Sequence, residues 1–257
     1  MSPIRPALSL CALLACAGPA AHADEPVQSV HVTGIADPEM RSYRSVAAGL
    51  DAFDANRALA PNATLRFRMR HADGSAVTAD DGLQLRLASD DGSFQQAVPI
   101  DAAGLLTVQR SEAARDADAT FILNRKNGQY TGHPEVRTAG LPDNVRRMGD
   151  LRLECRVTIA IVKEQMPFLA KAAVNTLMLT SDWCPKKDFN YGTPAPRPGV
   201  KGTLRAGDRS RTLDVHGWNA LVPIGDTSWP DDALVQFDEA VPEDLTRTAD
   251  GTPRTAP

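Results

Sequence analysis

The chain has 257 residues, and 32 aspartates and glutamates against 28 lysines and arginines give a formal net charge of −4 at pH 7. This acidic balance argues against a nucleic-acid partner, which would favour a basic face. Aromatic residues make up 5% of the chain, which disfavours an aromatic-lined platform for carbohydrate or single-stranded DNA.

The first 23 residues have the pattern of a secretory signal peptide. Arg5 supplies a positive charge, residues 7–17 are apolar, and Ala21-His22-Ala23 is a small-x-small cleavage site. The apolar run is shorter than the roughly 20 residues that a membrane-spanning helix needs. We therefore expect cleavage, no transmembrane segment in the mature chain, and a periplasmic or secreted location.

A second interpretation of the same segment stays open. Leu13-Leu14-Ala15-Cys16 resembles the lipobox of bacterial lipoproteins, in which Cys16 would become the lipidated first residue. The chain would then be anchored to a membrane through a lipid.

The cysteines outside the signal peptide predict one disulfide. Cys11 and Cys16 lie in the signal, so the mature chain keeps Cys155 and Cys184. A lone pair in an oxidising compartment indicates a structural bridge, here closing a loop of about 30 residues. A redox-active or metal-binding pair is the alternative, but no C-x-x-C occurs and no histidine is close to either cysteine.

After a short strand predicted around Val30 and Val32, the mature chain is predicted to form a helix and an arginine-faced strand. Asp37-Pro38-Glu39 is typical of a helix start, and apolar residues at three- and four-residue steps carry the helix to about Leu59. Leu65, Phe67 and Met69 then alternate with Arg66, Arg68 and Arg70, which predicts a half-buried strand. We interpret the arginine row, with Arg86, as a solvated face. An anionic partner such as a polysaccharide or a lipid head group is the alternative.

Further short strands follow at about ten-residue spacing. They are predicted at residues 83–88, 94–100, 105–108 and 120–123, with a hairpin turn at 89–93 in which Gly92 can take a positive φ. The strand–turn spacing of residues 64–108 resembles transthyretin-like and carboxypeptidase-regulatory-like β-sandwich modules. The likeness lies in the turn glycines and the alternation, and it implies a fold without assigning functional residues.

Between residues 124 and 149 the periodicity fades, which predicts a long loop or a seam between domains. A long central strand is then predicted from alternating apolar residues, followed by a helix at 168–178 and a loop at 185–198. Strands return at 202–205, 211–215, 219–224 and 233–237. The apolar positions of the long strand are Leu151, Leu153, Cys155, Val157, Ile159 and Ile161.

The sequence thus predicts a mainly β fold, an antiparallel β-sandwich with one or two helices. Two small sandwich-like halves are the alternative. The expected divisions are a signal peptide (1–23), a helix plus sandwich-like region (24–147), a second β-rich region with a short helix and the disulfide (148–241), and a disordered tail (242–257).

No catalytic, metal or cofactor motif stands out. The histidines lack ligand spacing, and the mature chain has no G-x-S-x-G, P-loop or G-x-G-x-x-G. The candidate binding residues are His216, Trp218, Asp226 and Trp229, which follow two predicted strands and could line loops at one end of a sandwich. The alternative is that both tryptophans are core residues.

These observations favour an exported, non-enzymatic protein of the bacterial cell envelope that binds a partner protein or an envelope ligand. One alternative is a hydrolase of envelope polymers, with a triad that assembles only in three dimensions around His71, His133 or His216. Another is a lipoprotein scaffold anchored through Cys16.

Overall fold

The computed structural model describes residues 36–178 and 182–238. The expected signal peptide, the short strand expected after it, Cys16 and the expected tail (242–257) lie outside the described residues. The described part forms three antiparallel sheets and four α-helices, so the predicted mainly β, antiparallel fold is confirmed.

Two of the sheets form the N-terminal half and face each other across a shared core. One has the order β1-β6-β3-β4 and the other the order β5-β2-β7. Phe67 and Met69 of the second sheet pack with Leu85 and Leu123 of the first, which makes this half sandwich-like. The bounds are β1 (Pro38–Ser42), β2 (Ala63–His71), β3 (Leu85–Ala88), β4 (Gln95–Val98), β5 (Leu105–Leu106), β6 (Thr120–Lys126) and β7 (Tyr130–Thr138).

The third sheet has six strands and its own core. Its order is β8-β13-β10-β11-β12-β9, and every pairing is antiparallel. Leu204, Val222, Val235 and Phe237 are fully or almost fully buried within it. Its strands are β8 (Val145–Arg147), β9 (Tyr191–Pro194), β10 (Gly202–Ala206), β11 (Arg209–His216), β12 (Asn219–Val222) and β13 (Leu234–Phe237).

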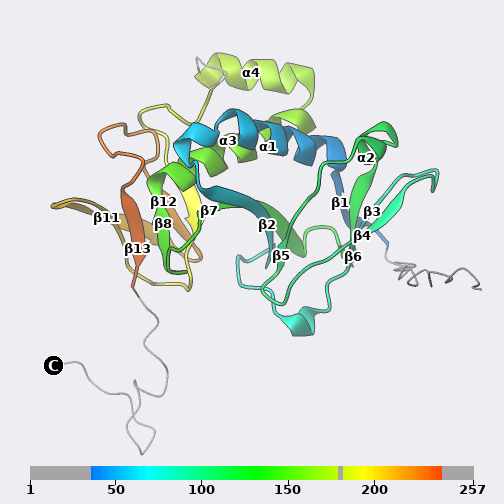
Figure 1. The fold of residues 1–257 in the computed structure, drawn as a ribbon, viewed down its shortest axis with the longest axis horizontal. Helices are drawn as coiled ribbons and strands as arrows, with labels where there is room; N and C mark the ends of the chain where they lie inside the picture. The colour runs from blue at the N-terminus through cyan, green and yellow to red at the C-terminus, as the bar shows by residue number, and fades with distance from the viewer. Residues whose placement is uncertain (1–35, 179–181, 239–257) are drawn as a thin grey trace, which may run out of the picture.

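The helices lie mostly above the sheets (Figure 1). Helix α1 (Tyr43–Ala55) packs along α3 (Met148–Gln165), while α4 (Phe168–Met178) lies above them. The short α2 (Glu112–Asp116) precedes β6. Where α1 meets α3, a Cβ at Gly49 would lie 2.7 Å from Ile161 Cγ1, so this close approach depends on glycine. Two 3₁₀ turns, η1 (Arg57–Leu59) and η2 (Ala79–Asp81), complete the elements.

The long strand predicted over residues 151–161 was wrong, because this segment belongs to helix α3. The helix lies between two cores and buries a stripe in each. Met148, Leu151 and Cys155 pack in the core of the six-stranded sheet, whereas Leu153 and Val157 pack in a core with β7. The stripes have three- and four-residue steps, and from Leu151 on the two together make every second residue apolar.

The predicted helix start at Asp37 was also wrong. Residues 38–42 pair with β6 as a strand, and α1 begins only at Tyr43. Ser42 is the N-cap, and its hydroxyl accepts a hydrogen bond from the Arg44 amide. The helix predicted at 168–178 is confirmed, and so is the turn after β3, where Gly92 has a φ of 73°.

Two predicted loops contain strands. Strands β7 and β8 occupy the stretch 124–149, and β9 lies within 185–198. Strand β7 contains Gly132 and Pro134, which hid it in the sequence. Proline is tolerated there because β7 is an outer strand of its sheet.

Candidate functional site

A cavity of about 330 Å³ lies between the two sheets of the N-terminal half. It opens between β1 and β7, beneath the C-terminal end of α3. A volume of this size falls at the lower end of the range for small-molecule sites, roughly 300–1,000 Å³. Its walls are aliphatic and aromatic: Val46, Phe67, Met69, Leu85, Leu106, Val108, Phe121, Leu123, Ile161 and Val162.

The rim of this cavity is polar. Arg41 contacts the Glu39 carboxylate at 3.2 Å, and its other terminal nitrogen donates to Gln165 Oε1 at 3.4 Å. His133 also borders the cavity, and its Nε2 lies 2.9 Å from Thr131 Oγ1. Burial, followed by the charges of Arg70 and Arg41, lowers the pKa of His133 below its ordinary value. The lowered pKa favours the uncharged form of the ring, and Arg41 at this rim is paired with the Glu39 carboxylate.

A second hollow, of about 490 Å³, lies on the opposite side of the sandwich between the outer strands β4 and β5. Its lining includes the polar residues Gln96, Asp101, Gln109 and Ser111. We regard the cavity beneath α3 as the better ligand site because apolar side chains make up most of its walls.

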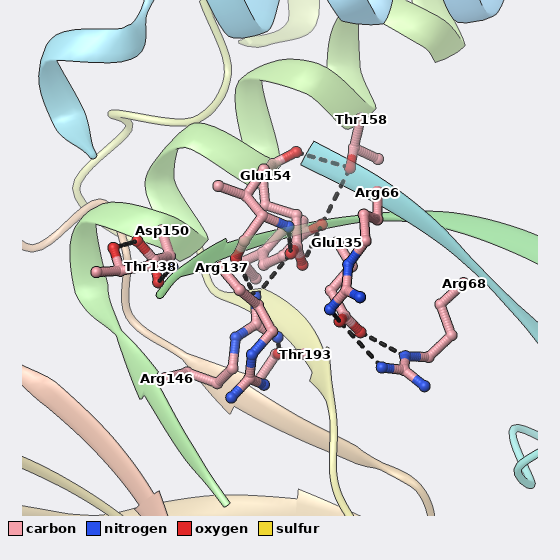
Figure 2. Close-up of polar contacts among 12 residues, drawn as sticks. Arg66, Arg68, Glu135, Arg137, Thr138, Arg146, Asp150, Glu154, Thr158 and Thr193 are labelled. Carbon is pink, nitrogen blue, oxygen red and sulfur yellow. Dashed lines mark hydrogen bonds and ion pairs between the residues drawn. The ribbon is translucent and has the colours of Figure 1, made fainter. Parts of the chain in front are cut away.

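A buried ion pair joins α3, β7 and β8 close to the cavity (Figure 2). Arg146 Nη2 donates to Glu154 Oε2 at 2.7 Å, and the Val136 amide donates to the same oxygen at 2.8 Å. Tyr191 Oη is 3.3 Å from Glu154 Oε1 and 3.0 Å from the hydroxyl of Thr158, which lines the cavity. Burial, with Glu154 next, raises the pKa of the Tyr191 phenol.

Electrostatics of this pair follow from its burial. Both side chains are almost fully inaccessible, with 6% of Arg146 and 3% of Glu154 exposed. Burial acts to lower the pKa of Arg146, but the carboxylates of Glu154, Glu135 and Asp150 together outweigh it and the pKa is raised. Burial raises the pKa of Glu154. The donors around this carboxylate are nevertheless those that an ionised group takes.

Helix α3 also supplies hydrogen-bond acceptors to the outer edge of β7 at a second position. Asp150 Oδ2 accepts the Thr138 amide at 2.8 Å, and Oδ1 accepts the Thr138 hydroxyl at 2.7 Å. Asp150 and Glu154 are four residues apart on α3 and therefore lie on one face. Their carboxylates take the place of a neighbouring strand for the amides of Val136 and Thr138.

The structure does not bring the four predicted binding residues together. His216 and Trp218 lie at the β11–β12 turn, where Trp218 packs against Gly74 of the N-terminal half. Trp229 is buried beneath Arg209, whose guanidinium is 4.1 Å from its ring centroid. Arg209 and His216 are the two ends of β11, about 20 Å apart at strand spacing.

Asp226 belongs to the Trp229 end. Its carboxylate accepts the Ser228 amide at 2.9 Å, and this hydrogen bonding, from the side chain first and then the backbone of Ser228, lowers the pKa of Asp226. The loop is tied to α3 by Arg152, which donates to the carbonyls of Asp226 and Trp229. These contacts show a packed turn of the C-terminal half.

The predicted disulfide between Cys155 and Cys184 is present, and both cysteines are buried. It links α3, rather than a strand, to the segment that follows α4.

The three histidines of the described residues lie in different environments. His71 Nε2 is 3.2 Å from Asp81 Oδ1, and Tyr130 stacks on the ring and donates to the same carboxylate oxygen. His133 is at the cavity rim and His216 is exposed on β11. In residues 36–178 and 182–238, no serine hydroxyl is hydrogen-bonded to a histidine ring, and no three potential ligands cluster for a metal.

None of the helices in the described part of the chain is both long and apolar enough to cross a bilayer. Sequence reasoning placed Phe67 and Met69 inside the sandwich but missed the cavity. Its rim comes from β1 and β7, which were predicted as a helix and a loop. No protein-family model matches this chain, and no curated protein or solved structure does.

Proposed function

We propose that this chain is an exported, non-enzymatic binding protein of the bacterial cell envelope. Its ligand would be a small amphipathic molecule, with an apolar body in the cavity between the sheets and an anionic end at the rim. The observation that carries this proposal is the combination of apolar walls with the side chains of Arg41 and Gln165 at the mouth. A pocket with a few polar groups that fix orientation is the usual form of a small-molecule site.

The hydrolase alternative has less support. His71 has a carboxylate partner in Asp81 but stacks on Tyr130, with no nucleophile hydrogen-bonded to it among the described residues. A triad requires the nucleophile, the base and its orienting acid within hydrogen-bond reach of one another.

Blocking the cavity mouth should weaken ligand binding. Val162 lines the cavity and is 38% exposed, so tryptophan fits there without overpacking the core. We expect Val162→Trp to weaken binding of the amphipathic anion anilinonaphthalene sulfonate at least about tenfold, or about 1.4 kcal/mol. Fluorescence titration, with dodecanoate as a competitor, measures this.

Leu221→Trp is the matched control, because Leu221 is 37% exposed on β12 of the six-stranded sheet and does not line the cavity. It should bind the dye as the wild type does. Equal dye binding by the Val162→Trp variant, or no competition by dodecanoate, would refute a ligand site in this cavity.

The proposed export is tested by the mature N-terminus. Expression in a bacterial host followed by intact mass measurement should give a periplasmic or secreted chain that begins at Asp24. A mass that fits a lipidated chain beginning at Cys16 would favour the lipoprotein alternative. A chain retained in the cytoplasm with Met1 in place would contradict export.

A further inference from the structure

The arginine row of β2 lies on the face of its sheet that points away from the cavity walls. Arg66, Arg68 and Arg70 alternate with Phe67 and Met69, which line the cavity. In the pairing with β7, Arg66 lies opposite Glu135 and Arg68 lies opposite His133. Directly opposed residues of an antiparallel pair share a face.

Two more arginines join this row. Arg137 of β7 lies opposite Thr64, and so on the same side of the sheet. Arg146 reaches in from β8 and donates to the Val136 carbonyl at 3.1 Å. We call these five residues the arginine face: Arg66, Arg68, Arg70, Arg137 and Arg146. In Figure 2 the side chains of Arg137 and Arg146 lie together, and Arg66 and Arg68 converge on Glu135.

Carboxylates do not neutralise the arginine face. Glu135 is held by Arg68 through two hydrogen bonds and has Arg66 at 3.9 Å. Glu154 is paired with Arg146, and Asp143 and Asp150 act on the arginines through their charge. With Glu135, four carboxylates therefore stand against five guanidinium groups. Burial, and then the neighbouring arginines, lower the pKa of Arg70 and Arg137 despite Glu135. A positive potential therefore persists at these two residues.

Donors on this face also lack acceptors. In the part of the chain that the structure describes, Arg70 Nε and Arg146 Nε are buried and have no hydrogen-bond partner. Arg146 is 95% buried as a residue, since its exposed fraction is 5%. Buried polar groups in proteins almost always have a partner, so an unsatisfied pair of charged donors requires an explanation. An anion that accepts from both would supply one.

We propose that the arginine face is a binding site for a phosphate group, separate from the cavity and independent of the function proposed above. The open donors belong to arginines on different strands, Arg70 on β2 and Arg146 on β8. A tetrahedral oxyanion presents oxygens in several directions, whereas a planar carboxylate is best matched by one bidentate guanidinium, as Glu135 is by Arg68. Arg66, whose side chain is 41% exposed, gives the site access to solvent.

Thermal unfolding and calorimetry with inorganic phosphate test this site. Phosphate at about ten times its dissociation constant should raise the melting temperature by about 3–6 °C over chloride of equal ionic strength. Arg66→Gln and Arg70→Lys should each weaken phosphate binding at least about fivefold. Arg70→Lys keeps the charge and removes the Nε donor, so it separates geometry from net charge.

Arg205→Gln is the matched control for Arg66→Gln, since Arg205 is exposed on β10 and its substitution removes the same charge. It should leave phosphate binding unchanged, and so should Val162→Trp. The proposal is overturned if phosphate stabilises no more than chloride, or if both arginine variants bind phosphate as the wild type does. Because Arg66 is partly exposed, its variant is expected to fold even if Arg70→Lys does not.

A second experiment distinguishes a phosphate group on a lipid from one on a soluble molecule. Vesicles containing phosphatidylglycerol should retain the protein if the group belongs to a lipid, and free phosphate should then compete. A response to free phosphate without retention on vesicles would place the group on a soluble molecule. Either result supports the site, whereas retention on vesicles that is insensitive to Arg66→Gln and Arg70→Lys would contradict it.

Discussion

Replacing Glu154 by leucine is expected to lower the free energy of unfolding by about 3–5 kcal/mol, because it leaves a buried arginine without its counter-charge. Arg146 is 6% exposed and cannot recover its lost partner from water. The substitution also removes the acceptor of the Val136 amide, which is 2.8 Å from Glu154 Oε2. Urea unfolding followed by circular dichroism measures the loss.

Glu164→Leu on the same helix is the matched control. Glu164 is exposed, so the identical substitution should change the free energy of unfolding by no more than about 0.5 kcal/mol. In the double variant Arg146→Met/Glu154→Leu, we expect a coupling of about 1–3 kcal/mol, since neither charge is then buried alone. A loss below about 1 kcal/mol for Glu154→Leu would show that the ion pair does not stabilise the contact between α3, β7 and β8.

Because the ion pair contacts several strands, its loss should destabilise more than helix α3. Arg146 also donates to the hydroxyl of Thr193 at 3.2 Å, which links β8 to β9, the two outer strands of the six-stranded sheet. Glu154 ties the same point to β7 of the N-terminal half. Hydrogen exchange at the Val136 amide should therefore accelerate in the Glu154→Leu variant more than exchange within β10, at the centre of the sheet.

The sequence predicted most strands because they bury one face only. Leu65, Phe67 and Met69 alternate with arginines, and the observed β2 follows that alternation. In the third sheet, strands β10 to β13 begin and end within a few residues of their predicted positions, whereas β8 and β9 lie in predicted loops. One-sided burial produces a clean period of two, which local sequence alone can reveal.

Helix α3 was misread because it buries two sides. Its apolar residues recur every three or four positions toward each core, and the offset of two between the stripes imitates a strand. Only the knowledge that two cores flank the segment separates these interpretations. A strand of eighteen residues would be unusually long. It would also have placed Arg152, Glu154 and Arg156 together on one face of the sheet.

The site was less predictable than the fold, because its members are brought together by pairing between distant segments. The cavity rim joins Arg41 of β1 to His133 of β7, and these residues are 92 positions apart (133 − 41). The arginine row was visible in sequence, but not its proximity to Arg137 and Arg146. Conversely, Trp218 and Trp229 are only 11 positions apart (229 − 218), yet they lie toward opposite ends of β11.

Opening the disulfide is expected to cost about 3–3.5 kcal/mol and to lower the melting temperature by about 7–14 °C. Cys155 and Cys184 are 29 positions apart, and the loop they close carries the end of α3 and all of α4. In the chain-entropy model, the bond stabilises the fold by restricting that loop in the unfolded state. Thermal unfolding of the oxidised and the reduced wild type measures the effect.

The Cys155→Ala/Cys184→Ala variant separates the covalent constraint from packing. Reduced wild-type protein retains both sulfur atoms in the core of the six-stranded sheet, whereas the double variant loses them. Any further loss in the double variant beyond the reduced wild type therefore reports packing, and we expect it to be the smaller part. If reduction changes the melting temperature by less than about 2 °C, loop closure does not stabilise this fold. Free thiols at both positions in exported, folded protein would show that the bond does not form.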